Sequence, residues 1–394
     1  MKTRIATVLV EGETAAAASR LAREVRTRLG EIEPTLLTFF ASSEHSLARM
    51  AHALQTEFRG VTILGASTAG EFIEQRDAKG AVALFALAGD YRTFGGIGSG
   101  LKENPERAVR EALDGLPREL NGYPYTTALL LLDPLAGNAE EVTLMTGAAL
   151  GQHVRLAGGA AGDDLHMKAT WVASGARAAS DAVAIGLIFS RTPLGVGVCH
   201  GHRPLSQPLK VTRAQGNVVR EVDGRPAWQV WLEQTRAHAK AVGLDTSSMG
   251  REEEGAFLLR YEAGLAAGRD YKIRAPLARR ADGSIDFACG IAEGAVIRIT
   301  ESIPAQQVAS AREAARRARA QLGTQSVAGA IVFDCICRKL ILGPEFAQAV
   351  RGISEELGGV PIAGFETYGE IALDVEDLSG FHNTTTVVLA FPHG

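Results

Sequence analysis

Hydrophobic and polar positions follow the same order three times along this chain. In each copy a short apolar run of strand character precedes a stretch of helical spacing, and a second apolar run follows the helix. The first apolar runs are 35–40, 128–132 and 330–333, the helical stretches are 44–58, 139–152 and 345–357, and the second apolar runs are 62–64, 154–156 and 360–362. A further apolar run closes each copy, at 81–88, 182–189 and 385–391. A long period of strands and helices predicts a protein built from related α/β units.

A glycine-rich motif that ends in an acidic residue follows the second apolar run of each copy. Residues 65–71 read G-A-S-T-A-G-E, and residues 364–370 read G-F-E-T-Y-G-E with the same spacing. A weaker form, A-G-G-A-A-G-D, ends at Gly162 and Asp163. Glycine frees the backbone at a strand tip and a carboxylate follows it, so the pattern favours a small-ligand site. The alternative is that the glycines only permit a turn.

The three copies cover about 1–90, 95–190 and 296–392, and an insert at 211–295 lacks the motif. We therefore expect two regions: 1–210 with two repeat units, and 211–394 with the insert followed by a third unit. The predicted fold class is α/β, with mixed β-sheets flanked by helices in a two-lobed body. A ligand pocket is expected where the motif tips meet, at the boundary between the lobes.

Composition narrows the classes of function. The 394 residues carry a net charge of −4, so the chain lacks the overall positive field that recruits nucleic acid. Four cysteines are too few for a disulfide framework, which favours a cytoplasmic location. No apolar run approaches the roughly 18 residues that span a bilayer, so we expect no direct membrane insertion.

Side chains in and near the motifs are the candidate binding residues. Carboxylates at the motif ends would hold a ligand ammonium or fix the neighbouring loop, and motif hydroxyls would donate to a ligand carboxylate. Arg338 could bind a carboxylate bidentately, or it could pair structurally with Asp334 or Glu345. The predicted binding set is Ser67, Thr68, Glu71, Gly158, Gly159, Asp163, Cys335, Arg338, Thr367, Tyr368, Glu370, His382 and Asn383.

Histidines and cysteines raise two further possibilities. His200 and His202 share one face of an extended segment and are candidate haem ligands, although histidines with satisfied ring nitrogens are commoner. Cys335 and Cys337 lack the spacing of a zinc site, so no metal is predicted. Without a catalytic motif we expect no enzyme and no catalytic residues. The alternative is a cysteine-dependent enzyme that uses Cys335 with His382 and Glu370.

The ordered set of motifs resembles the FIST family, with a FIST-N region followed by a FIST-C region. The resemblance is carried by residues 65–71, 158–163, 195–204, 222–227, 333–338, 361–371 and 381–385. It implies a bacterial-type sensory module of signal transduction that binds a small, amino-acid-like ligand and signals through a separate partner such as a histidine kinase. Some bacterial members are linked to haem and nitric-oxide sensing, which gives the alternative function.

The chain departs from the family pattern at two places. His202 stands where an aromatic residue is usual, and Cys337 and Lys339 stand beside Arg338 where glycines are usual. At these two places the resemblance says least about the role of the side chains.

Overall fold

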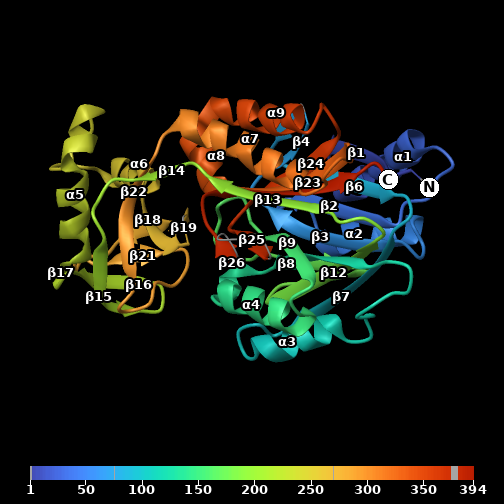
Figure 1. The fold of residues 1–394 in the computed structure, drawn as a ribbon, viewed down its shortest axis with the longest axis horizontal. Helices are drawn as coiled ribbons and strands as arrows, with labels where there is room; N and C mark the ends of the chain where they lie inside the picture. The colour runs from blue at the N-terminus through green and yellow to red at the C-terminus, as the bar shows by residue number, and fades with distance from the viewer. Residues whose placement is uncertain (1, 75, 269, 374–379) are drawn as a thin grey trace.

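The computed structural model describes residues 2–74, 76–268, 270–373 and 380–394. Its main body consists of three α/β units with the same order of elements (Figure 1). The first unit contains β1 (Arg4–Glu11), α1 (Thr14–Leu29), β2 (Leu36–Ser42), α2 (Leu47–Glu57), β3 (Thr62–Thr68), β4 (Glu71–Ile73), β5 (Arg76–Ala78) and β6 (Ala81–Ala88). The second contains β7 (Arg92–Ser99), α3 (Pro105–Leu113), β8 (Tyr125–Leu132), α4 (Ala139–Leu150), β9 (Val154–Ala160), β10 (Val172–Ser174), β11 (Arg177–Ala179) and β12 (Ala182–Ser190).

The third unit is interrupted by the insert. It begins with β13 (Gly195–His200) and resumes with α7 (Pro304–Ala320), β23 (Val327–Cys335), α8 (Ile336–Leu342), α9 (Phe346–Glu356), β24 (Ile362–Thr367), β25 (Glu370–Leu373), β26 (Gly380–His382) and β27 (Thr385–Pro392). The three sheets share one strand order: β1-β6-β2-β3, β7-β12-β8-β9 and β13-β27-β23-β24. In each, the last two strands are parallel and the other pairs are antiparallel. The predicted mixed sheets flanked by helices are confirmed.

The units exchange their short hairpins in a ring. The hairpin β4–β5 of the first unit pairs with β24 of the third, β10–β11 of the second pairs with β3 of the first, and β25–β26 of the third pairs with β9 of the second. Each sheet is therefore completed by a neighbouring unit. Removing any one unit would expose the edge of one sheet and leave one hairpin unpaired.

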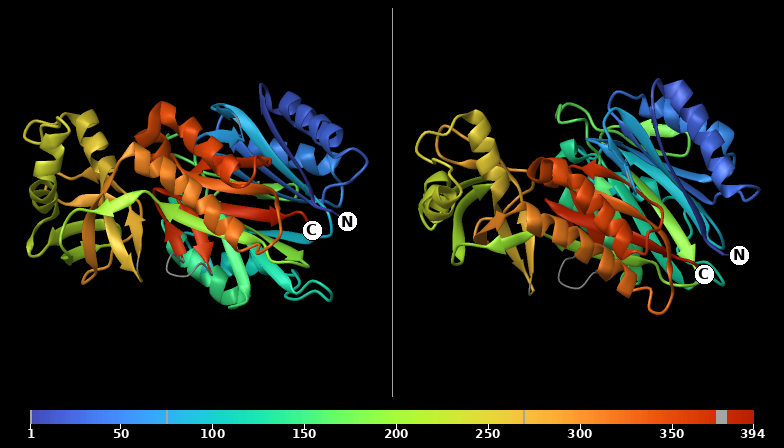
Figure 2. Two further views of the ribbon diagram at one scale, coloured as in Figure 1. Left: turned by 45° about the horizontal axis from the view of Figure 1, so that its top comes forward. Right: turned by 90° about the horizontal axis from the view of Figure 1, so that it is seen from above.

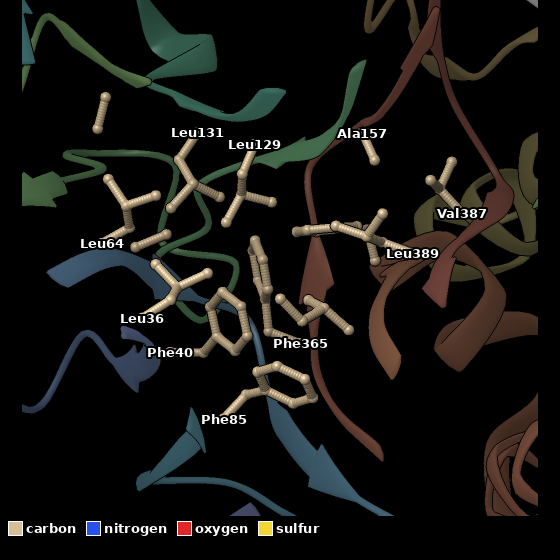
Figure 3. Packing of buried hydrophobic residues seen from close by; sticks show 14 of the residues in the cluster. Leu36, Phe40, Leu64, Phe85, Leu129, Leu131, Ala157, Phe365, Val387 and Leu389 are labelled. Carbon is tan, nitrogen blue, oxygen red and sulfur yellow. The ribbon is translucent and has the colours of Figure 1, made fainter. Parts of the chain in front are cut away.

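The inner faces of the three sheets meet in one hydrophobic core (Figure 3). Phe40 of β2 stacks on Phe365 of β24 with ring centroids 4.5 Å apart, and Phe333 of β23 meets Phe365 edge-on at 5.8 Å. The outer faces of the sheets are covered by helices, which form three separate apolar clusters. Sheets buried on both faces explain why most body strands read as continuous apolar runs.

The insert forms a second lobe at the end of the molecule that lies away from both termini (Figure 2). Its helices are α5 (Ala227–Ala241) and α6 (Arg251–Arg260), and its strands are β14 (His202–Pro204), β15 (Leu209–Gln215), β16 (Val218–Val222), β17 (Arg225–Pro226), β18 (Tyr261–Ala267), β19 (Asp270–Arg274), β20 (Pro276–Arg279), β21 (Ile285–Phe287) and β22 (Val296–Ser302). The predicted two-lobed body is confirmed.

The borders of the insert differ from those expected. The sequence pattern placed 296–302 at the start of the third unit, but β22 pairs with β14, β15 and β18 inside the second lobe. The first strand of the third unit is instead β13, which precedes the insert and pairs with β27. Apolar periodicity identifies a strand but does not identify its partner strand. For this reason the expected border between the insert and the third unit differs from the observed one.

Candidate functional site

The three glycine-rich motifs meet at one place and are joined by backbone hydrogen bonds. Between the first and third motifs, Ala69 N donates to Glu366 O at 3.1 Å and Glu366 N to Gly70 O at 2.8 Å. Gly162 N of the second motif donates to Ser67 O at 2.8 Å. The second motif is also tied to the third, because Ala160 N donates to Gly369 O at 2.7 Å. The strand tips therefore form one connected centre.

Glu71 and Glu370 occupy matching positions and fix the loops of their own units. The Glu71 carboxyl accepts the Thr68 hydroxyl and, at 3.1 Å, the Ala81 N–H. The Glu370 carboxyl accepts the Thr367 hydroxyl and, at 3.1 Å, the Thr385 N–H. Both side chains are fully buried. Burial raises the pKa of Glu71 to about 8 and raises the pKa of Glu370 well above its ordinary value. The sequence left two roles open for these carboxylates, binding a ligand ammonium or fixing the neighbouring loop. The observed contacts are those of loop fixation.

When the three motifs are aligned by strand pairing instead of by sequence, the second motif shifts by one residue relative to the other two. In each unit, the second residue of the closing strand pairs with a residue of the first parallel strand, and that residue pairs in turn with one in the second parallel strand. The residue reached in this way is Ser67 in the first unit, Ala160 in the second and Glu366 in the third. Gly158 therefore matches Gly65 and Gly364, and Asp163 matches Gly70 rather than Glu71. Asp133, at the end of β8, replaces the missing glutamate. Its carboxylate accepts the Thr170 hydroxyl and, at 2.6 Å, the Asp181 N–H.

Asp163 instead organises the loop 163–171. Its carboxylate accepts the Tyr368 hydroxyl at 2.6 Å and the backbone N–H groups of Met167, Lys168 and Ala169 at 2.6–3.0 Å. Burial opposes the charge, but the four donors outweigh it and lower the pKa of Asp163. An ionised carboxylate therefore holds this loop and contacts the third unit through Tyr368.

The loop 163–171 is held in a strained conformation. Asp164, Leu165 and Met167 have φ angles of 54°, 65° and 53°, which side-chain-bearing residues rarely adopt. Asp164 Oδ2 accepts the Ser42 hydroxyl at 2.9 Å and the Ser43 N–H at 2.8 Å, both from the first unit. Such strain persists only where the surroundings enforce it and is commonest at binding sites.

A cleft of about 480 Å³ lies between this loop and the first unit. It is formed by the carboxyl ends of the parallel strands β2 and β3, the first turn of α2 and the loop 163–171. The lining residues are Ser43, His45, Ser46, Leu47, Ala48, Ser67, Asp163, His166, Lys168, Ala169 and Trp171. Ligands of α/β proteins bind at this end of parallel strands, beside the N-terminus of the connecting helix.

Exposed apolar side chains accompany the cleft. Leu165 and Met167, in the loop, are 46% and 52% exposed, and Trp171, in the lining, is 39% exposed. Large apolar side chains on one short loop are unusual unless something covers them. This concentration agrees with a binding role for the cleft.

The structure brings only two of the predicted binding residues, Ser67 and Asp163, into the lining of this cleft. Gly158 and Gly159 lie inside β9, where a Cβ atom would approach Leu130 O to 1.9 Å and Thr367 Cγ2 to 2.7 Å, respectively. Sequence reasoning missed Ser43, His45, Lys168 and Trp171 because they lie in loops that the repeat does not reproduce. The polar run Asp163-Asp164-x-His166 in front of Lys168 marked the loop, and no motif marked the other three residues.

Arg338 is fully buried and engaged by other protein groups. Its guanidinium donates to Asp334 at 2.7 Å, to the Ser310 hydroxyl at 2.9 Å and to Gln307 O at 2.9 Å. The structural pair with Asp334, which the sequence left open, is thus present. Cys335 precedes α8 and is buried as well.

A second polar cluster lies at the boundary between the lobes. His200 Nδ1 accepts the His202 N–H at 3.2 Å, which leaves the Nε2–H of this ring to donate to Asp270 Oδ1 at 2.8 Å. His202 Nε2 lies 3.3 Å from Glu262 Oε2, and both side chains are fully buried. Burial lowers the pKa of His202 and raises the pKa of Glu262 to about 8.

The body contributes the loop after β26 to this boundary. The Thr384 hydroxyl donates to Glu262 Oε1 at 2.9 Å, and Thr384 has a φ of 50°, which is rare for a β-branched residue. Asn383 Oδ1 accepts the Ala275 N–H at 3.4 Å, and His382 beside it is buried. Predicted residues thus gather in two places, the cleft and this boundary.

The boundary cluster does not fit a haem. An axial ligand needs a ring nitrogen that faces an open apolar pocket. Here His200 Nε2 faces Asp270, and His202 is enclosed against Glu262. Within the part of the chain that the structure describes, no group of three histidine, cysteine or acidic side chains could hold a metal ion. Nor is any helix there both long and apolar enough to cross a membrane.

Two sequence families match this chain and together cover most of it. Residues 35–225 match the FIST N domain, and residues 229–373 match the FIST C domain. The chain belongs to the FIST family. FIST domains are associated with sensory roles in signal transduction. In this FIST protein the first match ends in β17 and the second begins inside α5, so the border between the two domains falls within the second lobe.

The FIST chain is also similar to curated proteins of mycobacteria. An uncharacterised protein of Mycobacterium bovis is 28% identical over 216 residues, which are 54% of each chain. An uncharacterised protein of Mycobacterium tuberculosis is 27% identical over 216 residues, which are 54% of this chain and 55% of that protein. The chain matches about half the length of these relatives.

Proposed function

We propose that this FIST protein is a sensory module that binds a small polar, amino-acid-like ligand in the cleft between its first and second units. The observation that carries the proposal is the position of the cleft at the carboxyl ends of β2 and β3. The first residues of α2, Ser67 and Lys168 all line that space. None of the lining residues comes from the second lobe, so the site proposed here lies within the body, whereas the sequence pattern favoured the lobe boundary.

Signalling would follow from the contacts of the loop 163–171. This loop is bonded to the first unit through Asp164 and to the third through Asp163 and Tyr368. A ligand that binds one loop conformation more tightly shifts the population toward it. A separate protein, such as a histidine kinase, would read that change in the cytoplasm. The four free cysteines agree with a reducing compartment.

The proposal is of a binding protein rather than an enzyme. Thiolates, not thiols, are nucleophiles. Burial raises the pKa of the Cys335 thiol well above its ordinary value, and burial also raises the pKa of Cys199 to about 11. These thiols stay protonated at neutral pH, which argues against a cysteine-dependent reaction at either position.

A thermal-shift screen of amino acids and related acids, followed by titration calorimetry of each hit, tests this function. We expect a hit to raise the melting midpoint of the natural chain and to lose that effect in Trp171→Ala. The control Leu144→Ala removes another exposed apolar side chain from α4, outside the cleft lining, and should respond normally. Equal responses of the two variants, or no hit at all, would contradict the proposal.

A visible absorption spectrum during titration with haemin tests the alternative. We expect no sharp Soret band, because neither boundary histidine has an open coordination face. A band that is lost in His200→Ala or His202→Ala would replace the cleft proposal with gas sensing.

A further inference from the structure

We infer that the cleft recognises a carboxylate attached to an apolar body, and that it does not require an ammonium group on the ligand. This inference rests on the proposed function, since it concerns the same cleft. It goes further by stating which end of an amino-acid-like molecule is recognised, and it predicts binding of analogues that lack the amino group.

Donors for a carboxylate converge on the cleft. Ser46, Leu47 and Ala48 are the cap and first two residues of α2, and all three line the space. Ser46 N donates to Thr14 Oγ1. The N–H groups of Leu47 and Ala48 lie in the first turn of the helix, where N–H groups have no acceptor within the helix. The Ser67 side chain is almost fully buried in the lining, and its oxygen accepts the Trp171 N–H at 2.9 Å. Its own hydrogen can then be donated toward the cleft.

Lys168 adds a cation to these donors. Its side chain is exposed at the cleft, and no carboxylate pairs with it among the residues that the structure describes. A charge-assisted hydrogen bond to a carboxylate is roughly twice as strong as one between neutral groups. Because the ammonium is not committed elsewhere, a ligand anion would be its natural partner.

The lining offers no uncommitted carboxylate to a ligand ammonium. Asp163 supplies the single carboxylate there, and all four of its acceptor positions are used by Tyr368 and the loop N–H groups. His45 is committed too, since its ring nitrogens lie 3.4 Å from Thr14 Oγ1 and 3.3 Å from Gly80 O. An ammonium bound to Asp163 or His45 would have to displace existing bonds.

The apolar part of the ligand is inferred from one aromatic side chain in the lining and two exposed apolar side chains on the neighbouring loop. Trp171 offers a partly exposed aromatic ring in the lining, and Leu165 and Met167 lie exposed on the same loop. Burying such side chains against a ligand is favourable in proportion to the area removed from water. A carboxylate with an aromatic or branched hydrocarbon body satisfies both halves of the cleft.

The test compares three probes of one shape: 3-phenylpropionate, phenylalanine and 3-phenylpropionamide. By titration calorimetry on the full chain, we expect 3-phenylpropionate to bind at least as tightly as phenylalanine and the neutral amide to bind at least about tenfold more weakly. Lys168→Met should weaken 3-phenylpropionate by roughly tenfold. Lys102→Met, which removes an exposed lysine outside the cleft lining, should leave binding unchanged.

The outcomes separate this inference from the proposed function. Binding of phenylalanine without binding of 3-phenylpropionate would overturn the inference and leave the sensory proposal standing. Equal binding of the amide, or an unchanged affinity in Lys168→Met, would overturn the carboxylate assignment. Failure of all three probes together with every other small acid would contradict both.

Discussion

The Tyr368 hydroxyl joins two units of the body at the edge of the cleft. It donates to Asp163 Oδ1 at 2.6 Å and accepts the Leu165 N–H at 2.7 Å. The corresponding position of the first motif is Ala69, which has no hydroxyl. The first motif therefore cannot make the hydrogen bonds that Tyr368 makes in the third. A single phenol therefore fixes both the ionised carboxylate and the strained backbone of the loop 163–171.

Tyr368→Phe should destabilise the protein by about 2 kcal/mol, because a hydrogen bond to a charged group contributes roughly 1.5–3 kcal/mol. The measurement is urea unfolding at neutral pH. Tyr125→Phe is the matched control, since Tyr125 is 43% exposed and its hydroxyl can be solvated. Equal unfolding free energies for the two variants would show that the Tyr368 hydroxyl does not hold the loop.

At the scale of single residues, the sequence indicated the chemistry better than the location. Ser67 and Asp163 were predicted from the motifs and lie at the cleft, whereas Arg338 was weighed as a ligand residue and is enclosed by Asp334, Gln307 and Ser310. A guanidinium that follows an apolar strand fits either role. What decides is the set of groups that three-dimensional packing brings around it, and these come from distant segments.

Among the elements, the exchanged hairpins make each unit depend on its neighbours. The strands and helices of the repeat were predictable from periodicity, because their apolar faces have fixed spacing. The exchange was not, because β4, β10 and β25 have only three or four residues each and their partners lie in other units. Glu71 fixes the first hairpin at its base, where it accepts the Ala81 N–H.

Glu71→Gln should remove a pH dependence from the stability. The folded chain holds the Glu71 proton up to about pH 8, whereas the unfolded chain releases it near the ordinary value of 4.5. The folded state therefore binds more protons between these values, and its stability falls as the pH rises from about 5 to 8. Glutamine does not titrate. The unfolding free energy of the variant should therefore rise relative to that of the natural chain by up to about 1.4 kcal/mol per pH unit in this window.

The measurement for Glu71→Gln is the difference in unfolding free energy from the natural chain at pH 5, 6, 7 and 8. Taking the difference cancels groups that titrate alike in both proteins. Glu119→Gln, at an exposed carboxylate, should give a difference that does not vary with pH. A constant difference for Glu71→Gln as well would mean that its carboxyl is already ionised in the folded protein.

For the whole molecule, polar contacts and two crossings of the chain join the lobes. The chain crosses between the lobes at Gly201 and again at Ile303. Across the boundary, Arg274 of the second lobe donates to Phe381 O at 3.0 Å and to Glu140 Oε1 at 2.8 Å. Polar interfaces of this kind permit relative motion of domains, in contrast to the apolar core that joins the three units.

Arg274→Met should loosen the second lobe without unfolding the body. The Arg274 side chain is buried, whereas Glu140 is partly exposed and can be solvated when its partner is lost. We expect faster hydrogen exchange at β19 and at residues 381–385, with unchanged protection in β2, β8 and β23, measured by mass spectrometry. Arg279→Met is the control, because Arg279 pairs with Glu254 inside the second lobe. If exchange rose equally throughout the body, the two lobes would open as one cooperative unit, which would contradict the prediction.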